Sequence, residues 1–397
     1  MTPRSGRLPA TERSCPRMSA YVVAGVRRQR SAVHVLRVFA AAASVLLVAL
    51  LAASPARAAR SDFVGIAQGP SLDVQDLRGM AAAGVGMDRF LLSWRSVEPT
   101  QTDTRWGPVD KVVGDLAAHG MRALPTLWGT PEWVLQGQSR PPVGSAFAEQ
   151  SWRDFLHRVV ARYGPGGSFW TNGYRLRFPN ATPIPIRAWQ IWNEPNVTRF
   201  FDPGQTVGHA ARQYARLLSI SHDAIRSQDP QASIVLAGLL RNANSMAWDF
   251  LNGLYTVPGF KGDFEVAALH PYAGDLNNFQ SAIEQFRGVM MFHGDGATPL
   301  WLTEFSWGSA APDSEGINKG PTGQRQMLID SFRLLLSHRA AWNVRRAYWY
   351  EWRDPAAWSS YANLCSWCGS SGLLRYDRSP KPAYYPFKNF AVNTTPP

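Results

Sequence analysis

Eight short runs rich in β-branched and aromatic residues recur along this chain of 397 residues, and stretches with helical periodicity lie between them. The strand-like runs cover 63–68, 87–93, 122–127, 187–192, 233–238, 264–269, 299–303 and 345–350. The helical stretches include 73–83, 106–119, 147–163, 206–228, 281–293, 322–337 and a last one opened by the prolines of Ser-Pro-Lys-Pro-Ala-Tyr-Tyr, 379–385. Alternation of this kind predicts a parallel sheet covered by helices.

The number of repeats favours a single (β/α)8 TIM barrel of the α/β class over residues 60–397. Eight strand–helix units commonly take about 250 residues plus insertions, which this length accommodates. A doubly wound open sheet is the structural alternative. It is disfavoured because the turn after the first strand lacks the GxGxxG phosphate loop.

Residues 1–58 are typical of an export signal. Nine arginines and one acidic residue, Glu12, give this stretch a charge of +8 out of +12 for the whole chain, so little basicity is left for binding a nucleic acid elsewhere. An uncharged run from Val38 to Ala56 then leads to Ala-Arg-Ala, and cleavage after Ala58 would release a secreted protein. The alternative is an uncleaved anchor at the cell surface, because the uncharged run approaches the roughly 20 residues that span a bilayer.

Two glutamates stand where predicted strands end. Glu194 lies in Trp-Asn-Glu-Pro-Asn after the fourth strand, and Glu304 lies in Thr-Glu-Phe-Ser-Trp after the seventh. In a barrel both would lie on the rim where the carboxyl ends of the strands meet. Two carboxylates on one rim are what glycoside hydrolysis requires, one protonated and one ionised, and a retaining pair is expected roughly 5 to 5.5 Å apart. An isolated Glu is more often a solvated surface charge on a helix, but neither of these glutamates lies in a predicted helix with polar neighbours.

With Asn-Glu-Pro after the fourth strand and Thr-Glu-Phe after the seventh, residues 62–392 resemble the clan A retaining glycoside hydrolases, family 39 first and family 5 next. The resemblance implies that Glu194 is the general acid/base and Glu304 the nucleophile. It also implies that Asn193 binds the 2-hydroxyl of the sugar. Family 39 enzymes often carry an accessory β-sandwich, for which this chain has no matching segment.

The same resemblance assigns supporting roles to three further residues. Arg89, on the second strand, matches the arginine that pairs with the nucleophile. His270 and Tyr272, in His-Pro-Tyr after the sixth strand, match a polar pair whose tyrosine donates a hydrogen bond to the nucleophile. A surface role for Arg89 and a purely structural core role for His270 are the alternatives.

Tryptophans cluster at the predicted strand ends and are candidate platforms for sugar rings, whose C–H faces stack on indoles. The family places such a platform after the eighth strand, but the sequence does not decide between the two tryptophans there. The candidates are Trp349, Trp352, Trp128 and Trp133. Each has a structural role in the core as its alternative.

Cys365 and Cys368 remain once the leader with Cys15 is removed, and an even pair in an exported chain predicts a disulfide. A thioredoxin-like redox motif is disfavoured because the pair lies in a loop rich in Ser, Asn and Gly rather than at a helix start. No second Cys pair or HExxH motif completes a metal site, so neither a metal nor an organic cofactor is expected.

The sequence therefore predicts a secreted, monomeric retaining glycosidase that acts on a polysaccharide, oligosaccharide or glycoside, without a nucleic-acid partner and without stable membrane association once the leader is cleaved. A catalytically silent carbohydrate-binding barrel and a transglycosylase with the same residues are the alternatives. Sugar, linkage and internal or terminal cleavage stay open, because they depend on loops that the pattern does not predict.

Overall fold

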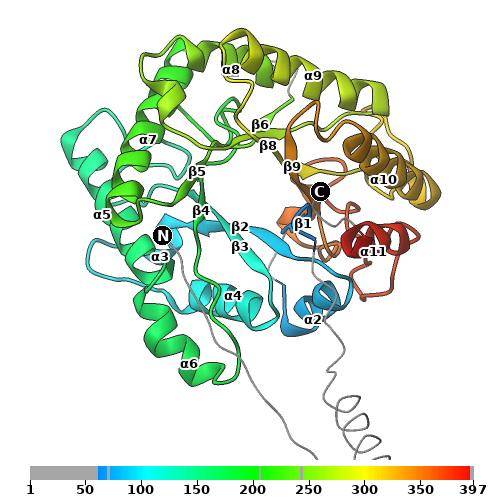
Figure 1. Ribbon diagram of the computed structural model, residues 1–397, viewed down its shortest axis with the longest axis horizontal. Helices are drawn as coiled ribbons and strands as arrows, with labels where there is room; N and C mark the ends of the chain where they lie inside the picture. Colours follow the sequence, from blue (N-terminus) through cyan, green and yellow to red (C-terminus); the bar gives the residue numbers. More distant parts are fainter. Residues whose placement is uncertain (1–60, 69–71, 205–206, 242–244, 394–397) are drawn as a thin grey trace, which may run out of the picture. The chain divides into compact units, whose positions relative to one another are not determined.

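The computed structural model describes residues 61–68, 72–204, 207–241 and 245–393. The predicted export signal, residues 1–58, lies outside the described residues. The rest forms the expected (β/α)8 barrel, in which a ring of helices surrounds parallel strands (Figure 1).

The barrel contains nine parallel strands at eight positions. They are β1 (Val64–Ala67), β2 (Met87–Ser93), β3 (Arg122–Trp128), β4 (Ala188–Ile191), β5 (Ser233–Val235), β6 (Leu239–Leu240), β7 (Ala267–His270), β8 (Leu300–Phe305) and β9 (Val344–Tyr350). The order is β5-β4-β3-β2-β1-β9-β8-β7-β6. The predicted fifth strand, 233–238, is observed only as β5, and β6 follows just beyond its predicted end; β5 pairs with β4 and β6 with β7, so these two short strands close the barrel. The bridge between Val235 and Val266 completes the closure.

The outer ring consists of long helices that alternate with the strands. They are α2 (Val74–Ala82), α4 (Gly107–Ala118), α5 (Ala146–Tyr163), α7 (Val207–Gln228), α8 (Ala247–Tyr255), α9 (Leu276–Phe292), α10 (Gly320–Ser337) and α11 (Tyr384–Asn393). Short helical turns add α3 (Trp94–Val97), a π-helical turn (Phe169–Gly173), α6 (Tyr174–Arg177) and two 3-10 turns (Phe260–Gly262, Ser360–Asn363). The sequence analysis did not predict α3, α6 or α8.

Polar caps determine where several helices begin. The side chain of Asp73 accepts hydrogen bonds from the backbone N–H groups of Gln75 and Asp76 at the start of α2, and Ser145 caps α5 in the same way. Asp275 caps α9, which starts five residues before the predicted Ser281 for this reason. Side-chain oxygens thus satisfy N–H groups that lack a partner in the first helical turn.

Alternation along the strands decides which side chains face the barrel interior. On β9, Trp349 packs outward against Phe305 and Trp307, with ring centroids 5.7 and 6.4 Å away, whereas the neighbouring Tyr350 lines the cavity inside the barrel mouth. Successive side chains on a strand point to opposite faces, so these two residues must have different environments.

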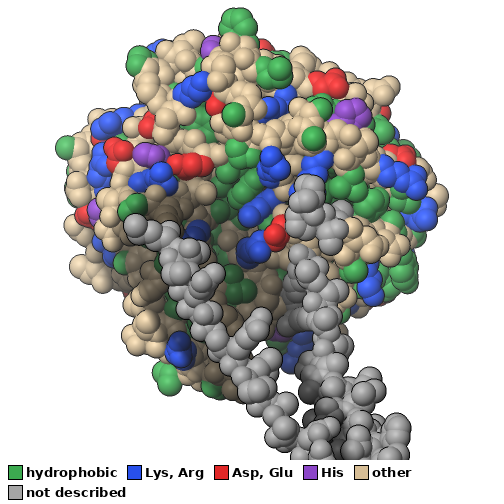
Figure 2. Space-filling model, viewed as in Figure 1, with side chains coloured by type: hydrophobic (Ala, Val, Ile, Leu, Met, Phe, Trp, Pro, Cys, Tyr) green, Lys and Arg blue, Asp and Glu red, His purple; other side chains and the backbone are tan. Residues whose placement is uncertain are grey.

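No helix within the described part of the chain is long and apolar enough to cross a membrane. On the face seen in Figure 2, Lys and Arg side chains gather near the middle, with acidic side chains scattered among and around them.

Candidate active site

The two glutamates singled out by the sequence lie at the mouth of the barrel, at the carboxyl ends of β4 and β8. Both line a cavity of about 250 Å³. Glu304 lies at a register irregularity between β8 and β9, and such irregularities re-aim side chains next to active sites. Glu194 follows β4 with a left-handed backbone (φ 43°), as does Trp192 (φ 71°). Such non-glycine conformations persist where the surrounding structure imposes them, commonly at functional sites.

Donors from two other strands hold the Glu304 carboxylate. Arg89, on β2, makes an ion pair with one carboxylate oxygen. The hydroxyl of Tyr272, which follows β7, donates to the other oxygen at 3.0 Å. Arg89 and Tyr272 are 2% and 6% exposed, so both hydrogen bonds are shielded from water and stronger than they would be at the surface.

Arg89 also orients the neighbouring polar groups. Its Nε donates to the side-chain oxygen of Gln190 at 2.6 Å, and a terminal nitrogen donates to Oδ1 of Asn193 at 2.7 Å. Because Oδ1 of Asn193 is occupied, its amide N–H₂ group remains to donate to a ligand in the cavity that Asn193 lines. Gln190 accepts a further hydrogen bond from Thr126.

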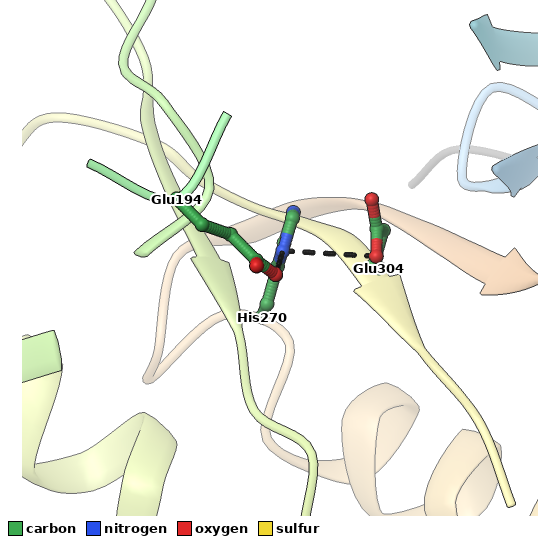
Figure 3. A group of neighbouring side chains, drawn as sticks. All are labelled: Glu194, His270 and Glu304. Atoms are coloured by element: carbon green, nitrogen blue, oxygen red, sulfur yellow. Dashed lines mark hydrogen bonds and ion pairs between the residues drawn. The ribbon is translucent and has the colours of Figure 1, made fainter. Parts of the chain in front are cut away.

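Glu194 is held from the opposite direction by His270. The Nδ1 of this fully buried histidine lies 2.7 Å from Glu194 and 3.8 Å from Glu304, between the two carboxylates (Figure 3). Its Nε2 faces the hydroxyl of Thr303 at 3.0 Å. A Cβ atom on Gly238 would lie 2.0 Å from that Nε2, so only glycine leaves room for the ring.

Glu194, His270 and Glu304 each offer one ligand atom, and these atoms all lie within 4.8 Å of one another. The group resembles a metal site only in spacing. Both oxygens of Glu304 already accept hydrogen bonds, and the adjacent guanidinium of Arg89 disfavours a cation. The arrangement is better suited to proton transfer between a carboxyl group and a bound ligand than to metal binding.

The environments of the two carboxyl groups move their pKa values in opposite directions. Burial raises the pKa of Glu194, and the nearby Glu304 charge adds to this, outweighing the contacts with His270 and Arg89. Burial alone would also raise the pKa of Glu304. The electrostatic attraction of His270 and Arg89, with hydrogen bonds from Tyr272 and Arg89, outweighs it and lowers that pKa below its usual range. Glu194 is therefore suited to carry a proton and Glu304 to be ionised.

One side of the cavity is formed by an irregular segment, residues 353–381, which we call the wall segment. Its half-buried Trp367 packs against Tyr272 with ring centroids 5.2 Å apart. Cys365 and Cys368 line the cavity and are joined by a disulfide around Trp367. Tyr361, also from this segment, accepts a hydrogen bond from the cavity-lining Tyr350 at 2.8 Å.

Buried polar contacts attach the wall segment to the barrel. The side-chain Nε2 of Gln324, on α10, lies 3.0 Å from the carbonyl oxygen of Trp307 and 3.3 Å from those of three consecutive wall residues, so its two N–H groups are shared among these acceptors: Trp307, Ser370, Ser371 and Gly372. Inside the segment, Lys381 is 2% exposed and pairs with Asp354 at 2.7 Å. The position of the aromatic and disulfide surface thus depends on a few buried anchors.

The structure does not place the four predicted platform tryptophans on the cavity. Trp349 and Trp352, one of which was expected to bind sugar, are 0% and 1% exposed and lie in the core, so neither presents its ring to the cavity. Trp349 faces the helices, and Trp352 packs against Tyr384. Trp128 and Trp133 are half-buried, and their indole N–H groups donate to backbone carbonyls instead of facing the cavity. The aromatic side chains that line the cavity are Phe200, Tyr272, Tyr350, Tyr361 and Trp367.

Sequence reasoning also missed Gln190, on β4, which connects β2, β3 and β8 with the residue that follows β5. Its amide donates to the carbonyl of Leu236 and to Thr303, and its oxygen accepts from Arg89 and Thr126. The signal was available: a lone Gln in the otherwise apolar run Ala-Trp-Gln-Ile-Trp must find partners inside the barrel.

Comparisons with known proteins bear on the family and the fold. Residues 177–369 match the family described as glycosyl hydrolase catalytic core. No curated protein sequence matches the chain. A family 39 glycoside hydrolase from Bacteroides cellulosilyticus WH2 is similar in structure, with a TM-score of 0.60 and 18% identity over 85% of this chain and 64% of that one. This chain therefore spans less than two thirds of that enzyme.

Two further structures extend the likeness. A monomeric beta-xylosidase from Caulobacter crescentus CB15 gives a TM-score of 0.59 and 16% identity, over 84% of this chain and 69% of that one. A family 5 enzyme from Bifidobacterium longum subsp. longum ATCC 55813, solved with Manb1-4GlcNAc, gives 0.60 and 13% over 84% and 78%. The chain thus has the barrel fold of the clan A glycoside hydrolases, and its expected resemblance to families 39 and 5 is confirmed.

Proposed function

We propose that this protein is a retaining glycoside hydrolase that cleaves O-glycosidic bonds through a covalent glycosyl-enzyme. The observation that carries the proposal is the carboxylate pair. Glu194 and Glu304 present oxygens within 4.8 Å of each other, and their pKa values are shifted in opposite directions. Retaining enzymes hold their carboxyl groups about 5 to 5.5 Å apart, whereas inverting enzymes need about 6.5 to 9.5 Å to admit water.

In the first step, the ionised Glu304 attacks the anomeric carbon while Glu194 donates its proton to the departing glycosidic oxygen. The bond from the anomeric carbon to that oxygen breaks, and an ester bond to Glu304 forms. The leaving group departs as an alcohol, and Glu194 is left ionised. Loss of the proton is favoured because Glu304 has given up its negative charge at the same moment.

In the second step, Glu194 accepts a proton from water, whose oxygen attacks the anomeric carbon and releases Glu304. Two inversions restore the original anomeric configuration, and both carboxyl groups return to their starting protonation states. If a sugar hydroxyl replaces water, the same residues carry out transglycosylation.

The surrounding side chains support these roles. Arg89 and Tyr272 stabilise the ionised nucleophile, and the amide N–H₂ group of Asn193, which has no partner within the described part of the chain, can bind the sugar 2-hydroxyl. His270 is a positioning residue because it contacts Glu194 but does not line the cavity. Hydrogen bonds to the 2-hydroxyl strengthen in the oxocarbenium-like transition state.

We further propose a carbohydrate substrate, export through the 1–58 leader and action as a monomer. Relatives of similar fold are named as a beta-xylosidase, a beta-galactosidase and an exo-beta-1,4-mannosidase. Aryl β-xylosides, β-galactosides and β-mannosides are therefore the first substrates to test, since their activated leaving groups reveal the first step directly.

The test is kinetic and uses the two single variants. We expect Glu304→Ala to abolish hydrolysis, and azide to restore turnover with formation of a glycosyl azide of inverted configuration. Glu194→Ala should lose about 10²–10⁴-fold on substrates with poor leaving groups but retain the first step on aryl glycosides. Glu284→Ala, at an exposed carboxyl on α9, is the matched control and should behave like the unchanged protein.

Near-normal turnover by Glu304→Ala would refute the assignment. A protein that binds glycans but releases no reducing sugar from any aryl glycoside would be the silent binding barrel. Products of the opposite anomeric configuration from the unaltered enzyme would establish inversion instead of retention.

A further inference from the structure

The catalytic cavity adjoins a second cavity on each of two opposite sides. One, of about 320 Å³, shares Gln68 and Leu91 with it. The other, also about 320 Å³, shares Leu240, Tyr272 and Trp367. The catalytic cavity therefore borders each flanking cavity at two or three shared side chains, and the three cavities are neighbours on the surface.

Their positions follow from the strand order. The first flanking cavity lies at the ends of β1 and β2 and reaches the start of α4, while the second lies at the ends of β6 and β7. Strands β1 and β2 stand across the barrel from β6, as Figure 1 shows, with β3 to β5 on one side and β8 and β9 on the other. The carboxylates come from β4 and β8, so the line through the three cavities passes between Glu194 and Glu304.

Both flanking cavities have surfaces suited to sugars. On the β6–β7 side, Trp367 and Tyr272 offer aromatic rings, and the guanidinium of Arg241 has no partner among the described residues. Glu315, which accepts a hydrogen bond from Ser366 at 2.6 Å, also lines this cavity. The first cavity combines apolar and hydroxyl-bearing side chains: Phe90, Leu91, Val97, Val109, Ser93 and Ser96. Pyranose rings present the matching combination of apolar faces and hydroxyl edges.

We propose that these cavities are subsites on either side of the cleavage point, so that the enzyme binds a glycan chain across the barrel mouth and cleaves internal linkages. The inference rests on the proposed glycosidase function. An enzyme that removes terminal sugars must block the chain on one side of the central site, whereas here both sides continue into further cavities. The substrate class is therefore a polysaccharide, or an oligosaccharide of at least three residues.

The test compares a polymer with an aryl glycoside of the same sugar, using xylan, mannan and galactan alongside the three aryl glycosides. Internal cleavage should lower the viscosity of the polymer steeply while few reducing ends have formed, and oligosaccharides should precede monosaccharides. Ser96→Trp and Arg241→Trp fill one flanking cavity each. Each should lower the ratio of polymer to aryl glycoside kcat/KM by about tenfold or more, equivalent to about 1.4 kcal/mol of lost binding in the transition state.

Ser337→Trp, at an exposed serine that ends α10, is the control and should leave that ratio unchanged. Thermal unfolding identifies a variant that fails to fold. If one of the two cavity-filling variants does not fold, the kinetic ratio of the other one tests the proposal. Aryl glycoside hydrolysis with release of monosaccharide alone and constant viscosity, or an unchanged ratio in both filled variants, would overturn internal cleavage but leave the glycosidase intact. Absence of hydrolysis on every substrate would remove the proposed function and this inference with it.

Discussion

The hydrogen bond from Tyr272 to Glu304 should set the acidic limit of activity. Tyr272→Phe removes one donor to a buried carboxylate at 3.0 Å and keeps the ring that packs on Trp367. A hydrogen bond to a charged group contributes about 1.5–3 kcal/mol. Since 1.36 kcal/mol corresponds to one pKa unit, the pKa of Glu304 should rise by about 1 to 2 units in the variant.

The sign follows from the role of the carboxylate. Glu304 must be ionised to attack, so kcat/KM falls as the pH drops through its pKa, which Tyr272 helps to lower. Without the tyrosine hydroxyl that pKa is higher, and the acidic limb of the pH profile moves to higher pH by about 1 to 2 units. The carboxyl groups titrate as a pair, so the comparison is between whole profiles of kcat/KM on one aryl glycoside.

Tyr350→Phe is the matched control. Tyr350 lines the same cavity, but its hydroxyl donates to Tyr361 and touches neither carboxylate. Its acidic limb should coincide with that of the unaltered enzyme. If Tyr272→Phe also left the limb in place, the reasoning that hydrogen bonding keeps Glu304 ionised would be refuted.

Two further variants and reduction of the disulfide test the scaffold around the site. Gln190→Leu leaves buried donors unpaired and should cost about 1–3 kcal/mol per group in stability, seen in denaturant unfolding with a loss of kcat; a stable, fully active variant would contradict its role. Gly238→Ala places a methyl group on the ring of His270 and should cost about 1–3 kcal/mol or more and lower kcat, whereas an unchanged melting temperature and kcat would show that the ring can move. The Cys365–Cys368 disulfide closes only a short loop, so its reduction should cost only about 1 to 2 kcal/mol in stability while raising KM. Thiol labelling of the denatured, unreduced protein should find no free thiol on either cysteine, and two free thiols per chain would exclude the disulfide.

Sequence patterns were sufficient for the barrel and for the placement of its two glutamates. The runs around β2 and β3 combine an apolar core face with turn residues at both ends, so their bounds were predicted within one residue. Glu194 and Glu304 were found because both follow predicted parallel strands, whose carboxyl ends meet on one rim, and because their motifs resemble those of clan A enzymes. The predicted fifth strand, 233–238, is shorter in the structure, where β5 ends at Val235 and β6 begins after Gly238, at which a Cβ atom would collide with His270.

The aromatic platform could not be predicted because it depends on which residues of β9 point into the barrel. A shift of one residue exchanges the interior and exterior faces, and nothing in the run Tyr-Trp-Tyr-Glu-Trp indicates which residue is inside. Pairing with β8 places Tyr350 inside and Trp349 against the helices. The path of the wall segment could not be predicted from the sequence either, because tertiary contacts such as those of Gln324 determine it.

The reacting groups and the surface that contacts the rest of the substrate come from different parts of the chain. The carboxylates and their donors come from β2, β4, β7 and β8 or the turns directly after them, whereas one disulfide-bearing insertion between β9 and α11 supplies Tyr361 and Trp367. Mutations in that insertion can reshape the cavity without moving the reacting groups, provided that the contacts of Gln324 and Lys381 are kept. A library confined to residues 355–369 is therefore the economical route to altered sugar preference, and natural divergence in specificity is expected to concentrate in the same stretch.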